Sequence, residues 1–378
     1  MKFLFLTGSR SEWGYIKPLL DNCKKNKIKF TICATNMHLL ATHGMAINEI
    51  KKDGYKVDHE IYMSLEGGNY YTMAKSMGVF QISFVDVILK EKPDWIILAG
   101  DRNETLIGAI CGAYTYTPVA HIQAGELSGN IDGMARHAIG KFAHLHFASN
   151  TDAVKRLKKL GENNFRIKNV GAPQLDGLKE ISSKNIKKIK KHYNIMSNDK
   201  FCLVVFHPLT EEFKLVSKQT KILINTLNKI KLKKFWIMPN NDAGYQNVKN
   251  VLLDYRKSDT QLIRNMSRED YLTLLKYSEF IIGNSSSGII EAPTFAIPAI
   301  NLGNRQKNRF RGKNVIDLES FEEKLILNKI KIATSKSFKN KIKKAKNPYG
   351  NGNSTEKIIK ILKETKITKN LISKHLTY

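Results

Sequence analysis

The sequence predicts an α/β protein with two doubly wound, Rossmann-like domains. Short apolar runs alternate with longer amphipathic stretches along the chain, a pattern typical of parallel sheets covered by helices on both faces. Between residues 170 and 200, a loop-like segment and a lysine-rich amphipathic stretch separate two such series. A chain of 378 residues is also long enough for two domains of ordinary size.

The first series begins with a buried strand and continues as alternating strands and helices. Short continuous apolar runs predict strands at residues 2–7, 30–34, 94–99, 119–122 and 145–149. Apolar residues three or four positions apart predict helices at residues 12–25, 71–90, 105–116 and 134–142. Strand, helix and strand in this order form a parallel sheet with helices on both faces.

The second series has the same character. Strands are expected at residues 201–206, 235–238, 280–282 and 299–302, and helices at 217–229, 268–276 and 286–293. A turn cluster at 347–353 precedes a last helix at 354–363 and a basic tail. We therefore expect domains at 1–175 and 176–345, and a terminal segment at 346–378 whose helix can pack back on the first domain.

The net charge of +28 would suit a nucleic-acid partner. The lysines, however, are mixed with Ile and Asn in runs typical of exposed helix faces, and no zinc finger, recognition helix or aromatic-studded basic motif accompanies them. We therefore expect no specific nucleic-acid partner.

Arginine is rare in this lysine-biased chain, and its placement indicates an anionic ligand. Only eleven of the 62 basic residues are arginine. Six of them are Arg10, Arg102, Arg136, Arg305, Arg309 and Arg311, and five of these six lie in glycine-containing, loop-like stretches next to predicted strand ends. The planar guanidinium suits phosphate or carboxylate, although some of these arginines can instead pair with surface acids.

The cysteines and the apolar runs bear on location. Cys23, Cys33, Cys111 and Cys202 are scattered and form no CxxC pair, which indicates neither a zinc site nor a disulfide framework. A reducing cytoplasm fits them best. No apolar run approaches the roughly 20 residues that span a bilayer, and the N-terminal run is too short for a signal peptide. We expect a cytoplasmic protein without membrane insertion.

Three glycine-containing loops are candidates for phosphate binding. Residues 283–288 place three serines between a strand and a helix, and successive N–H groups at a helix start favour phosphate. Residues 8–14 form a weaker candidate after the first strand, and residues 303–312 form a cationic loop suited to a diphosphate leaving group. Ordinary turns, caps or solvated loops remain the alternatives. Glu291 is placed to accept hydrogen bonds from a ribose.

Acids follow two neighbouring predicted strands of the first series. Asp101, Glu126 and Asp132 are expected to converge at one sheet edge, where mutual repulsion raises at least one pKa and provides an acid and a base. These acids can alternatively cap helices or pair with arginines. Metal binding by carboxylates and histidines stays open, but HEXXH and similar spacings are absent, so we expect no metal and no cofactor.

Five segments, in order, resemble the hydrolysing UDP-N-acetylglucosamine 2-epimerases of sialic acid and related nonulosonic acid synthesis. They are Gly8-Ser9-Arg10, Gly100 to Glu104, His121 to His137, Asn284 to Glu291, and Gly303 to Gln306. The match runs over residues 1–315 and is more specific than any single segment.

The resemblance implies a GT-B-like fold, two domains facing a cleft that holds UDP. It implies nucleotide-binding roles for Arg10, Arg102, His207, Asn240, Ser285, Ser286, Glu291 and Arg305. It implies that Asp101, Glu126 and Asp132 are the catalytic carboxylates. The chain departs from many relatives at Ala124 and Gly133, which are expected near the sugar pocket, so the sugar's identity stays open.

The reaction that the resemblance implies is elimination of UDP to a glycal, followed by rehydration to UDP and the free 2-epimer. The substrate is UDP-N-acetylglucosamine or a UDP-2,4-diacetamido-2,4,6-trideoxy sugar, as in legionaminic acid synthesis, and the enzyme is expected to be a homodimer or homotetramer. A GT-B glycosyltransferase using a UDP-sugar and a non-enzymatic basic nucleic-acid-binding protein are the alternatives.

Overall fold

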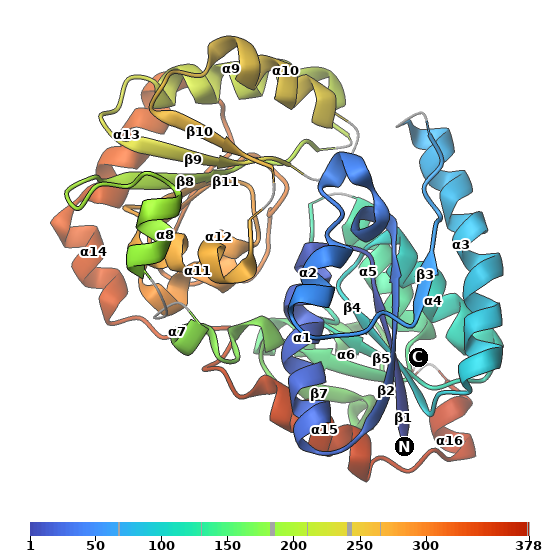
Figure 1. The fold of residues 1–378 in the computed structure, drawn as a ribbon. Helices are drawn as coiled ribbons and strands as arrows, with labels where there is room; N and C mark the ends of the chain where they lie inside the picture. Colours follow the sequence, from blue (N-terminus) through green and yellow to red (C-terminus); the bar gives the residue numbers. More distant parts are fainter. Residues whose placement is uncertain are drawn as a thin grey trace. The chain divides into compact units, whose positions relative to one another are not determined.

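The computed structural model describes residues 1–378 apart from 67–68, 130, 182–185, 210, 240–243, 265, 376 and 378. The chain forms two compact units (Figure 1). Unit 1 comprises Met1–Leu127, Ile131–Asp176 and Tyr349–Tyr378, and unit 2 comprises Ser128–Asn130 and Gly177–Pro348. Each unit has a parallel sheet with helices on both faces, which confirms the fold class expected from the sequence.

Within the described residues, unit 1 has a seven-stranded sheet in the order β3-β2-β1-β4-β5-β6-β7. Its strands are β1 (Lys2–Thr7), β2 (Lys29–Thr35), β3 (His59–Ile61), β4 (Trp95–Ala99), β5 (Val119–Ile122), β6 (Leu145–Ala148) and β7 (Ile167–Asn169). Its helices are α1 (Arg10–Lys25), α2 (Ile47–Lys52), α3 (Tyr70–Glu91), α4 (Asn103–Tyr114), α5 (Ile131–Phe142), α6 (Thr151–Lys159), α15 (Ser354–Glu364) and α16 (Lys369–Ile372). All strand pairs are parallel.

Successive residues of β1 feed two separate cores, because side chains alternate between the faces of a strand. Phe3 and Phe5 belong to the cluster that includes residues of α1 and α15. Leu4 and Leu6 belong to the cluster with residues of α3, α4 and α5. Burial on both faces explains why this strand reads as a continuous apolar run rather than an alternating one.

Unit 2 has a six-stranded sheet, again counted over the described residues, in the order β10-β9-β8-β11-β12-β13. Its strands are β8 (Phe201–Val205), β9 (Lys233–Ile237), β10 (Thr260–Ile263), β11 (Ile281–Gly283), β12 (Ala299–Leu302) and β13 (Val315–Leu318). Its helices are α7 (Leu178–Ile181), α8 (Ile186–His192), α9 (Val216–Leu227), α10 (Tyr245–Tyr255), α11 (Arg268–Tyr277), α12 (Ser287–Ile290), α13 (Glu323–Thr334) and α14 (Lys336–Lys343).

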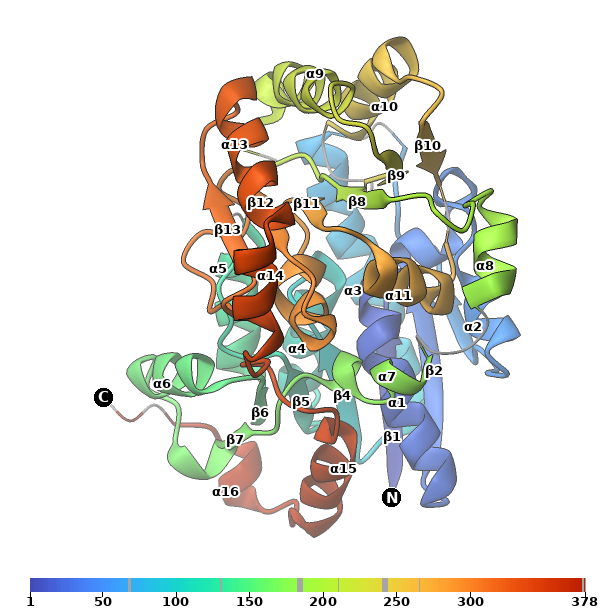
Figure 2. The ribbon, with the colours of Figure 1, turned by 90° about the vertical axis from the view of Figure 1, so that its left-hand side faces the viewer.

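The central strand β8 also divides its side chains between two cores. Cys202 and Val204 pack with residues of α9 and α13, whereas Leu203 and Val205 pack with residues of α8 and α11. Figure 2 shows α9 and α10 on one side of β8 and β9, with α11 on the other side.

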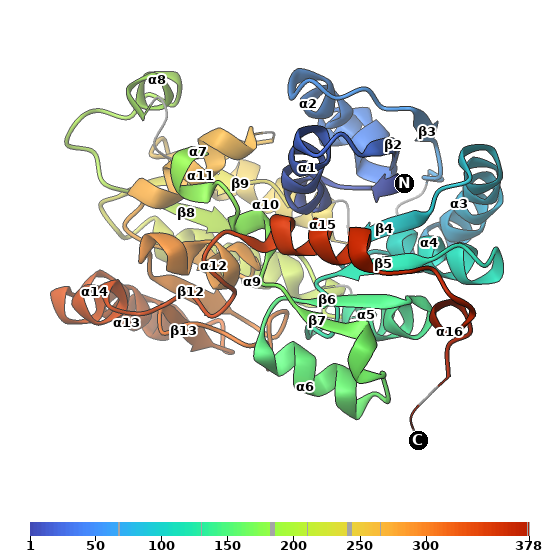
Figure 3. The same cartoon turned by 90° about the horizontal axis from the view of Figure 1, so that it is seen from below.

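The end of the chain packs on unit 1. Asp176 accepts hydrogen bonds from the backbone N–H groups of Ser354 (2.9 Å) and Thr355 (2.6 Å), so its carboxylate satisfies donors at the start of α15. Figure 3 shows α15 beside α1, and Ile358 is buried in the shared core. Further on, Arg166 donates to the carbonyl of Leu371 at 2.8 Å, which anchors α16.

Helix α3 differs from the expectation that no stretch is long and apolar enough to cross a membrane. Among the described residues it is the one helix that meets both criteria, with a mean hydropathy of 1.3 over its most apolar window, of which 28% is buried. Phe80 and Phe84 pack into the core of unit 1. Ile82 and Leu89, on the other hand, are 74% and 69% exposed.

Candidate functional site

Five residues that the sequence assigned to a ligand lie at the carboxyl edge of the unit 1 sheet. They follow β1, β4 and β5, of which β4 lies between the other two. Arg10 is the first residue of α1, and Arg102 is the N-cap of α4. The acids are Asp101, Glu126 and Asp132, the last of which is partly exposed in the first turn of α5. Ligands of doubly wound sheets bind at this edge.

Asp101 is held by a buried arginine. Its carboxylate forms an ion pair with Nη2 of Arg136, whose side chain is 3% exposed, while Asp101 is 18% exposed. Nη1 of Arg136 also donates to the carbonyl of Gln123 at 2.9 Å. Arg136 therefore joins the loop after β4 to the loop after β5, and its expected role as a ligand-binding arginine gives way to that of an internal partner of Asp101.

Glu126 is the most buried of the three predicted catalytic acids, with 1% exposure. Oε1 accepts a hydrogen bond from Asn150, and Oε2 accepts one from the hydroxyl of Tyr349 at 3.1 Å. These partners are distant in sequence, and no local motif marks them. Ala124, expected near the sugar, is fully buried in an apolar cluster with Ala148.

The loop after β4 is also fixed by a neutral histidine. Nε2 of His121 is 2.7 Å from the carbonyl of Gly100, whose φ of 87° is in the left-handed region that favours glycine. Burial lowers the pKa of His121 to about 3, so the ring is neutral near pH 7 and bonds to this carbonyl as an N–H donor.

A different pair of buried acids, Glu12 and Glu104, also lies at this edge. Glu12 and Glu104 are 2% and 0% exposed, and burial followed by the charge of Glu104 raises the pKa of Glu12 well above its usual value. From the sequence, such a shift was expected among Asp101, Glu126 and Asp132 but not at Glu12. Glu12 forms a capping box with Ser9 at the start of α1.

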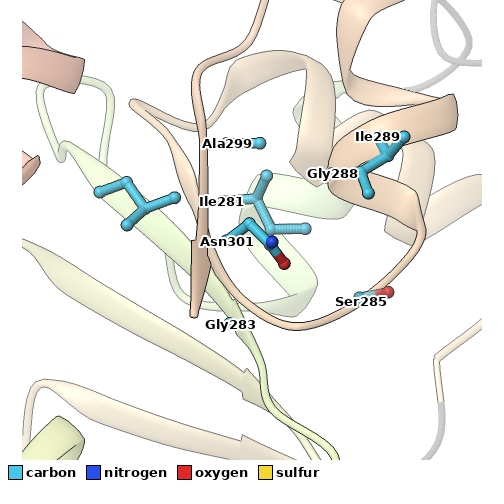
Figure 4. Close-up of a pocket in the computed structure, with 8 residues that line it drawn as sticks. Ile281, Gly283, Ser285, Gly288, Ile289, Ala299 and Asn301 are labelled. Carbon is cyan, nitrogen blue, oxygen red and sulfur yellow. The ribbon is translucent and has the colours of Figure 1, made fainter. Parts of the chain in front are cut away.

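In unit 2, the Ser285–Gly288 turn follows β11. Gly283 has φ of 135°, and a Cβ there would lie 2.1 Å from the carbonyl oxygen of Val205, so only glycine fits. Ser285 and Ser286 are partly exposed, and Ser286 is the N-cap of α12. Figure 4 shows Ser285 and Gly288 around a cavity of about 10 Å³, which is far too small for a nucleotide.

Asn284 connects three loops at the carboxyl edge of unit 2. Its side chain accepts from the backbone N–H of His207 and donates to its carbonyl, both at 2.8 Å. Its own carbonyl accepts hydrogen bonds from Arg305 (3.2 Å) and Gln306 (3.1 Å). His207, Ser285 and Arg305, which the sequence assigned to the nucleotide, thus follow neighbouring strands that Asn284 joins.

Glu291 lies at the end of a helix that is shorter than expected. The sequence predicted one helix over 286–293, but α12 is a single turn, and a 3-10 helix containing Pro293 (Ala292–Phe295) follows it. Glu291 is the C-cap of α12 and is 8% exposed. Burial raises its pKa, whereas the positive charge of Arg268 acts in the opposite direction.

The cationic loop after β12 has fewer available cations than the sequence suggested. Arg311 forms an ion pair with Asp317 and donates to the carbonyl of Arg309 at 2.9 Å. Arg309 is 4% exposed and donates to Gln306 at 3.1 Å. The third arginine, Arg305, is partly exposed and donates to the carbonyl of Asn284.

Asn240, assigned to the nucleotide, lies outside the described residues. Across the residues that the structure describes, no group of three or more His, Cys, Asp and Glu side chains is arranged to hold a metal ion.

Comparisons with known proteins agree with this architecture. Residues 21–363 match the UDP-N-acetylglucosamine 2-epimerase family. The chain is 33% identical to the UDP-N,N'-diacetylbacillosamine 2-epimerase (hydrolyzing) of Legionella pneumophila, covering 100% of this chain and 99% of the relative. It is 32% identical to the UDP-N-acetylglucosamine 2-epimerase of Neisseria meningitidis, covering 88% of each. The crystal structure of UDP-GlcNAc 2-epimerase from Neisseria meningitidis bound to UDP-GlcNAc has a TM-score of 0.82, with 20% identity over 97% of this chain and 100% of that one.

The two parallel sheets and the structural match define a two-domain α/β protein of the GT-B-like class. The chain belongs to the UDP-N-acetylglucosamine 2-epimerase family, and it is an enzyme of that family. The resemblance drawn from five short segments is therefore confirmed. The alternatives, a glycosyltransferase and a basic nucleic-acid-binding protein, are not favoured.

Proposed function

We propose that this protein is a hydrolysing 2-epimerase of a UDP-linked 2-acetamido sugar. Its membership of the UDP-N-acetylglucosamine 2-epimerase family carries the proposal. Two features of the chain support it. Acidic side chains gather at the carboxyl edge of the unit 1 sheet, and a serine turn with an adjacent arginine lies at the carboxyl edge of the unit 2 sheet.

The reaction begins with loss of UDP, because the hydrogen on C2 of the sugar is too weakly acidic for direct epimerisation. A carboxylate takes the proton from C2, and the electron pair of the broken C2–H bond forms the C1–C2 double bond of a glycal. The C1–O bond breaks at the same time, and both of its electrons go to UDP. Water then adds at C1 and gives one proton to a carboxylate, while a carboxylic acid protonates C2 from the opposite face. The products are UDP and the free manno-configured sugar.

Asp101, Glu126 and Asp132 are proposed to share the proton transfers, with Asp101 held in place by Arg136. The proposed nucleotide-binding residues are Arg10, Arg102, His207, Asn240, Ser285, Ser286, Glu291 and Arg305. Arg305 and the N–H groups of the serine turn would stabilise the charge that develops on the departing diphosphate.

The sugar is either N-acetylglucosamine or a 2,4-diacetamido-2,4,6-trideoxy sugar. The two relatives above are named for different substrates and are 33% and 32% identical to this chain, so identity alone does not separate them. The two sequence departures, Ala124 and Gly133, are both buried, so their exposure does not separate the two sugars either.

Proton NMR in deuterated water tests the proposal with both substrates. We expect release of UDP and of the free 2-epimer carrying deuterium at C2. Replacing Asp101 or Asp132 by Asn, or Glu126 by Gln, should lower turnover by about 100-fold or more. Asp254→Asn, an exposed acid on α10, is the matched control and should keep the wild-type rate. Three active carboxylate variants would refute the assignment, and transfer of the sugar without a free epimer would refute the reaction.

Binding of UDP tests the residues of unit 2 separately. Ser286→Ala and Arg305→Ala are expected to weaken UDP binding measured by calorimetry, because each removes a donor for the diphosphate. Lys307→Ala removes a charge from the same loop, where Lys307 pairs with Glu319 and its side chain is 51% exposed, and should leave the affinity unchanged. Equal UDP affinity in all three variants would contradict the proposed nucleotide site.

We also propose that the enzyme is a homo-oligomer and that α3 forms its interface. Val79, Ile82, Val85 and Leu89 recur every three or four residues and are at least 36% exposed. The charged residues of α3 are two lysines, one aspartate and one glutamate, so the formal charge of the helix is zero in a chain of net charge +28. A second copy of the chain can approach a neutral apolar face without charge repulsion, whereas an anionic membrane surface would favour lysines around it.

A cytoplasmic location is proposed as well. All four cysteines are free and buried, and burial raises the pKa of the Cys23 thiol to about 12 and that of Cys111 to about 11. Buried, protonated thiols scattered through both units are typical of proteins that work under reducing conditions.

A further inference from the structure

Two buried glutamates from different helices meet at the turn between β1 and α1. Oε2 of Glu12 accepts hydrogen bonds from the backbone N–H groups of Gly8 and Ser9, the latter at 3.0 Å. Oε1 of Glu12 accepts one from the hydroxyl of Thr105 at 3.1 Å. Glu12 thus joins the turn after β1 to the first turn of α4, where Glu104 also lies.

The carboxyl group of Glu104 lies directly against Gly8. A Cβ added at Gly8 would be 1.8 Å from Oε1 and 2.6 Å from Cδ of Glu104. Oε2 of Glu104 accepts a hydrogen bond from Nδ2 of Asn36 at 3.0 Å. Oε1 is buried and has no hydrogen-bond partner among the described residues. Since Glu12 bonds to the N–H of Gly8, both carboxyl groups adjoin the same residue.

The surroundings of the two acids disfavour two negative charges. Both side chains are almost inaccessible to water, and two carboxylates that share such a site ionise one at a time. Arg102 is the cation that acts on Glu12. On the neighbouring segment, His38 is buried, and its Nε2 lies 2.9 Å from the hydroxyl of Thr7. Burial is the main cause that lowers the pKa of His38 to about 3, and the charge of Arg10 acts in the same direction. His38 therefore adds no positive charge near pH 7.

We propose that Glu12 and Glu104 share a single proton and act as a positioning pair for the reaction. One carboxylic acid and one carboxylate can lie side by side at Gly8, and they hold the segment that carries Arg10 against the segment that carries Asp101. Neither glutamate takes part in the chemistry. The kinetic part of this inference rests on the proposed function, whereas its thermodynamic part does not.

Loss of the shared proton should separate the two segments. At alkaline pH both acids would be ionised in a site that water barely reaches, and their repulsion would displace Arg10 and Asp101. The folded-state pKa of Glu12 is raised, so its contribution to stability is complete below the unfolded value and is lost as pH rises through the folded value. Both kcat/KM and the unfolding temperature should therefore fall as pH rises.

Glutamine imitates the protonated acid and cannot ionise, so it separates this mechanism from a purely structural role. We would measure kcat/KM and the unfolding temperature of the wild type, Glu12→Gln, Glu104→Gln and Glu12→Ala from pH 6 to 10. In both Gln variants the alkaline fall in both quantities should shift upward by at least about one pH unit or disappear. Glu12→Ala should lower kcat/KM roughly tenfold or more near pH 7, because it removes the cap of the β1 turn. Glu12→Gln should keep most of the wild-type kcat/KM at the same pH.

The proposal of a shared proton would be refuted if the unfolding temperature fell with pH in the same way in the wild type and in both Gln variants. Lys374, whose pKa burial lowers to about 8, also titrates in this range, but all the variants retain it. If the enzyme turns over UDP-sugars and the alkaline fall persists in the Gln variants, the pair is refuted and the proposed function stands. If no UDP-sugar is turned over, the unfolding temperatures still test the pair.

Discussion

Gly8 has no space for a side chain. Its Cα lies against the carboxyl group of Glu104, and a methyl group would be 1.8 Å from Oε1. Glu104 is fully buried and bonded to Asn36, so it cannot move aside without losing that bond. We expect Gly8→Ala to lower the free energy of unfolding by about 1–3 kcal/mol through overpacking, as measured by urea unfolding.

Gly140→Ala is the control for this prediction. Gly140 lies inside α5, and a Cβ there would meet nothing within 4 Å. Alanine is favoured over glycine inside a helix by roughly 0.5–1 kcal/mol, so this variant should be as stable as the wild type or slightly more stable. If Gly8→Ala unfolded at the same urea concentration as Gly140→Ala, the close contact with Glu104 would be wrong.

Site residues could be predicted from the sequence where the end of a strand marks their position. The partners that hold these residues in place could not be predicted. Asp101 and Glu126 follow apolar runs, so their place at the sheet edge can be inferred from the sequence. Arg136, which holds Asp101, lies inside a helix, and Tyr349, which bonds to Glu126, is 223 residues away from it. Such contacts depend on tertiary packing, for which one sequence has no local pattern.

At the scale of elements, the strands that were not predicted from the sequence are the four edge strands. Strands β3, β7, β10 and β13 are three or four residues long and combine buried with exposed or partly exposed residues. The central strands are buried on both faces and appear as continuous apolar runs, whereas an edge strand needs no such run. The alternation of strands and helices was therefore sufficient for the fold class but not for the full strand order.

The exposed face of α3 yields a prediction about assembly. Ile82→Glu combined with Leu89→Glu would bury four charges in an interface between two copies, and we expect the dissociation constant to rise at least about 100-fold. Light scattering after size exclusion should show a wild-type mass that is a multiple of the 43.0 kDa chain, and a double variant of about one chain mass.

A charge on another exposed apolar residue serves as the control for assembly. Leu253 on α10 is 52% exposed, and Leu253→Glu should keep the wild-type mass. A double variant on α3 with an unchanged mass would exclude this face as the interface. A wild-type mass of one chain would refute the proposed oligomer itself.

For the whole molecule, the buried histidines make unit 1 sensitive to acid. Burial is the main cause that lowers the pKa of His38 and His121 to about 3, and of His144 and His146 to about 4. A lowered folded-state pKa means that the contribution to stability is present above the unfolded value of about 6.5 and is lost as pH falls toward the folded value. At pH 5 each of these histidines should cost about 2 kcal/mol relative to neutral pH.

The three tryptophans allow this loss to be followed in each unit of the intact chain. Trp13 and Trp95 belong to unit 1 and Trp236 to unit 2, so Trp236→Phe leaves reporters in unit 1, and the double variant Trp13→Phe and Trp95→Phe leaves one in unit 2. We expect the urea midpoint from the unit 1 reporters to fall further between neutral pH and pH 5 than the midpoint from Trp236, because the four histidines lie in unit 1. A larger fall at Trp236, or equal falls in both variants, would show that these histidines do not limit stability in acid.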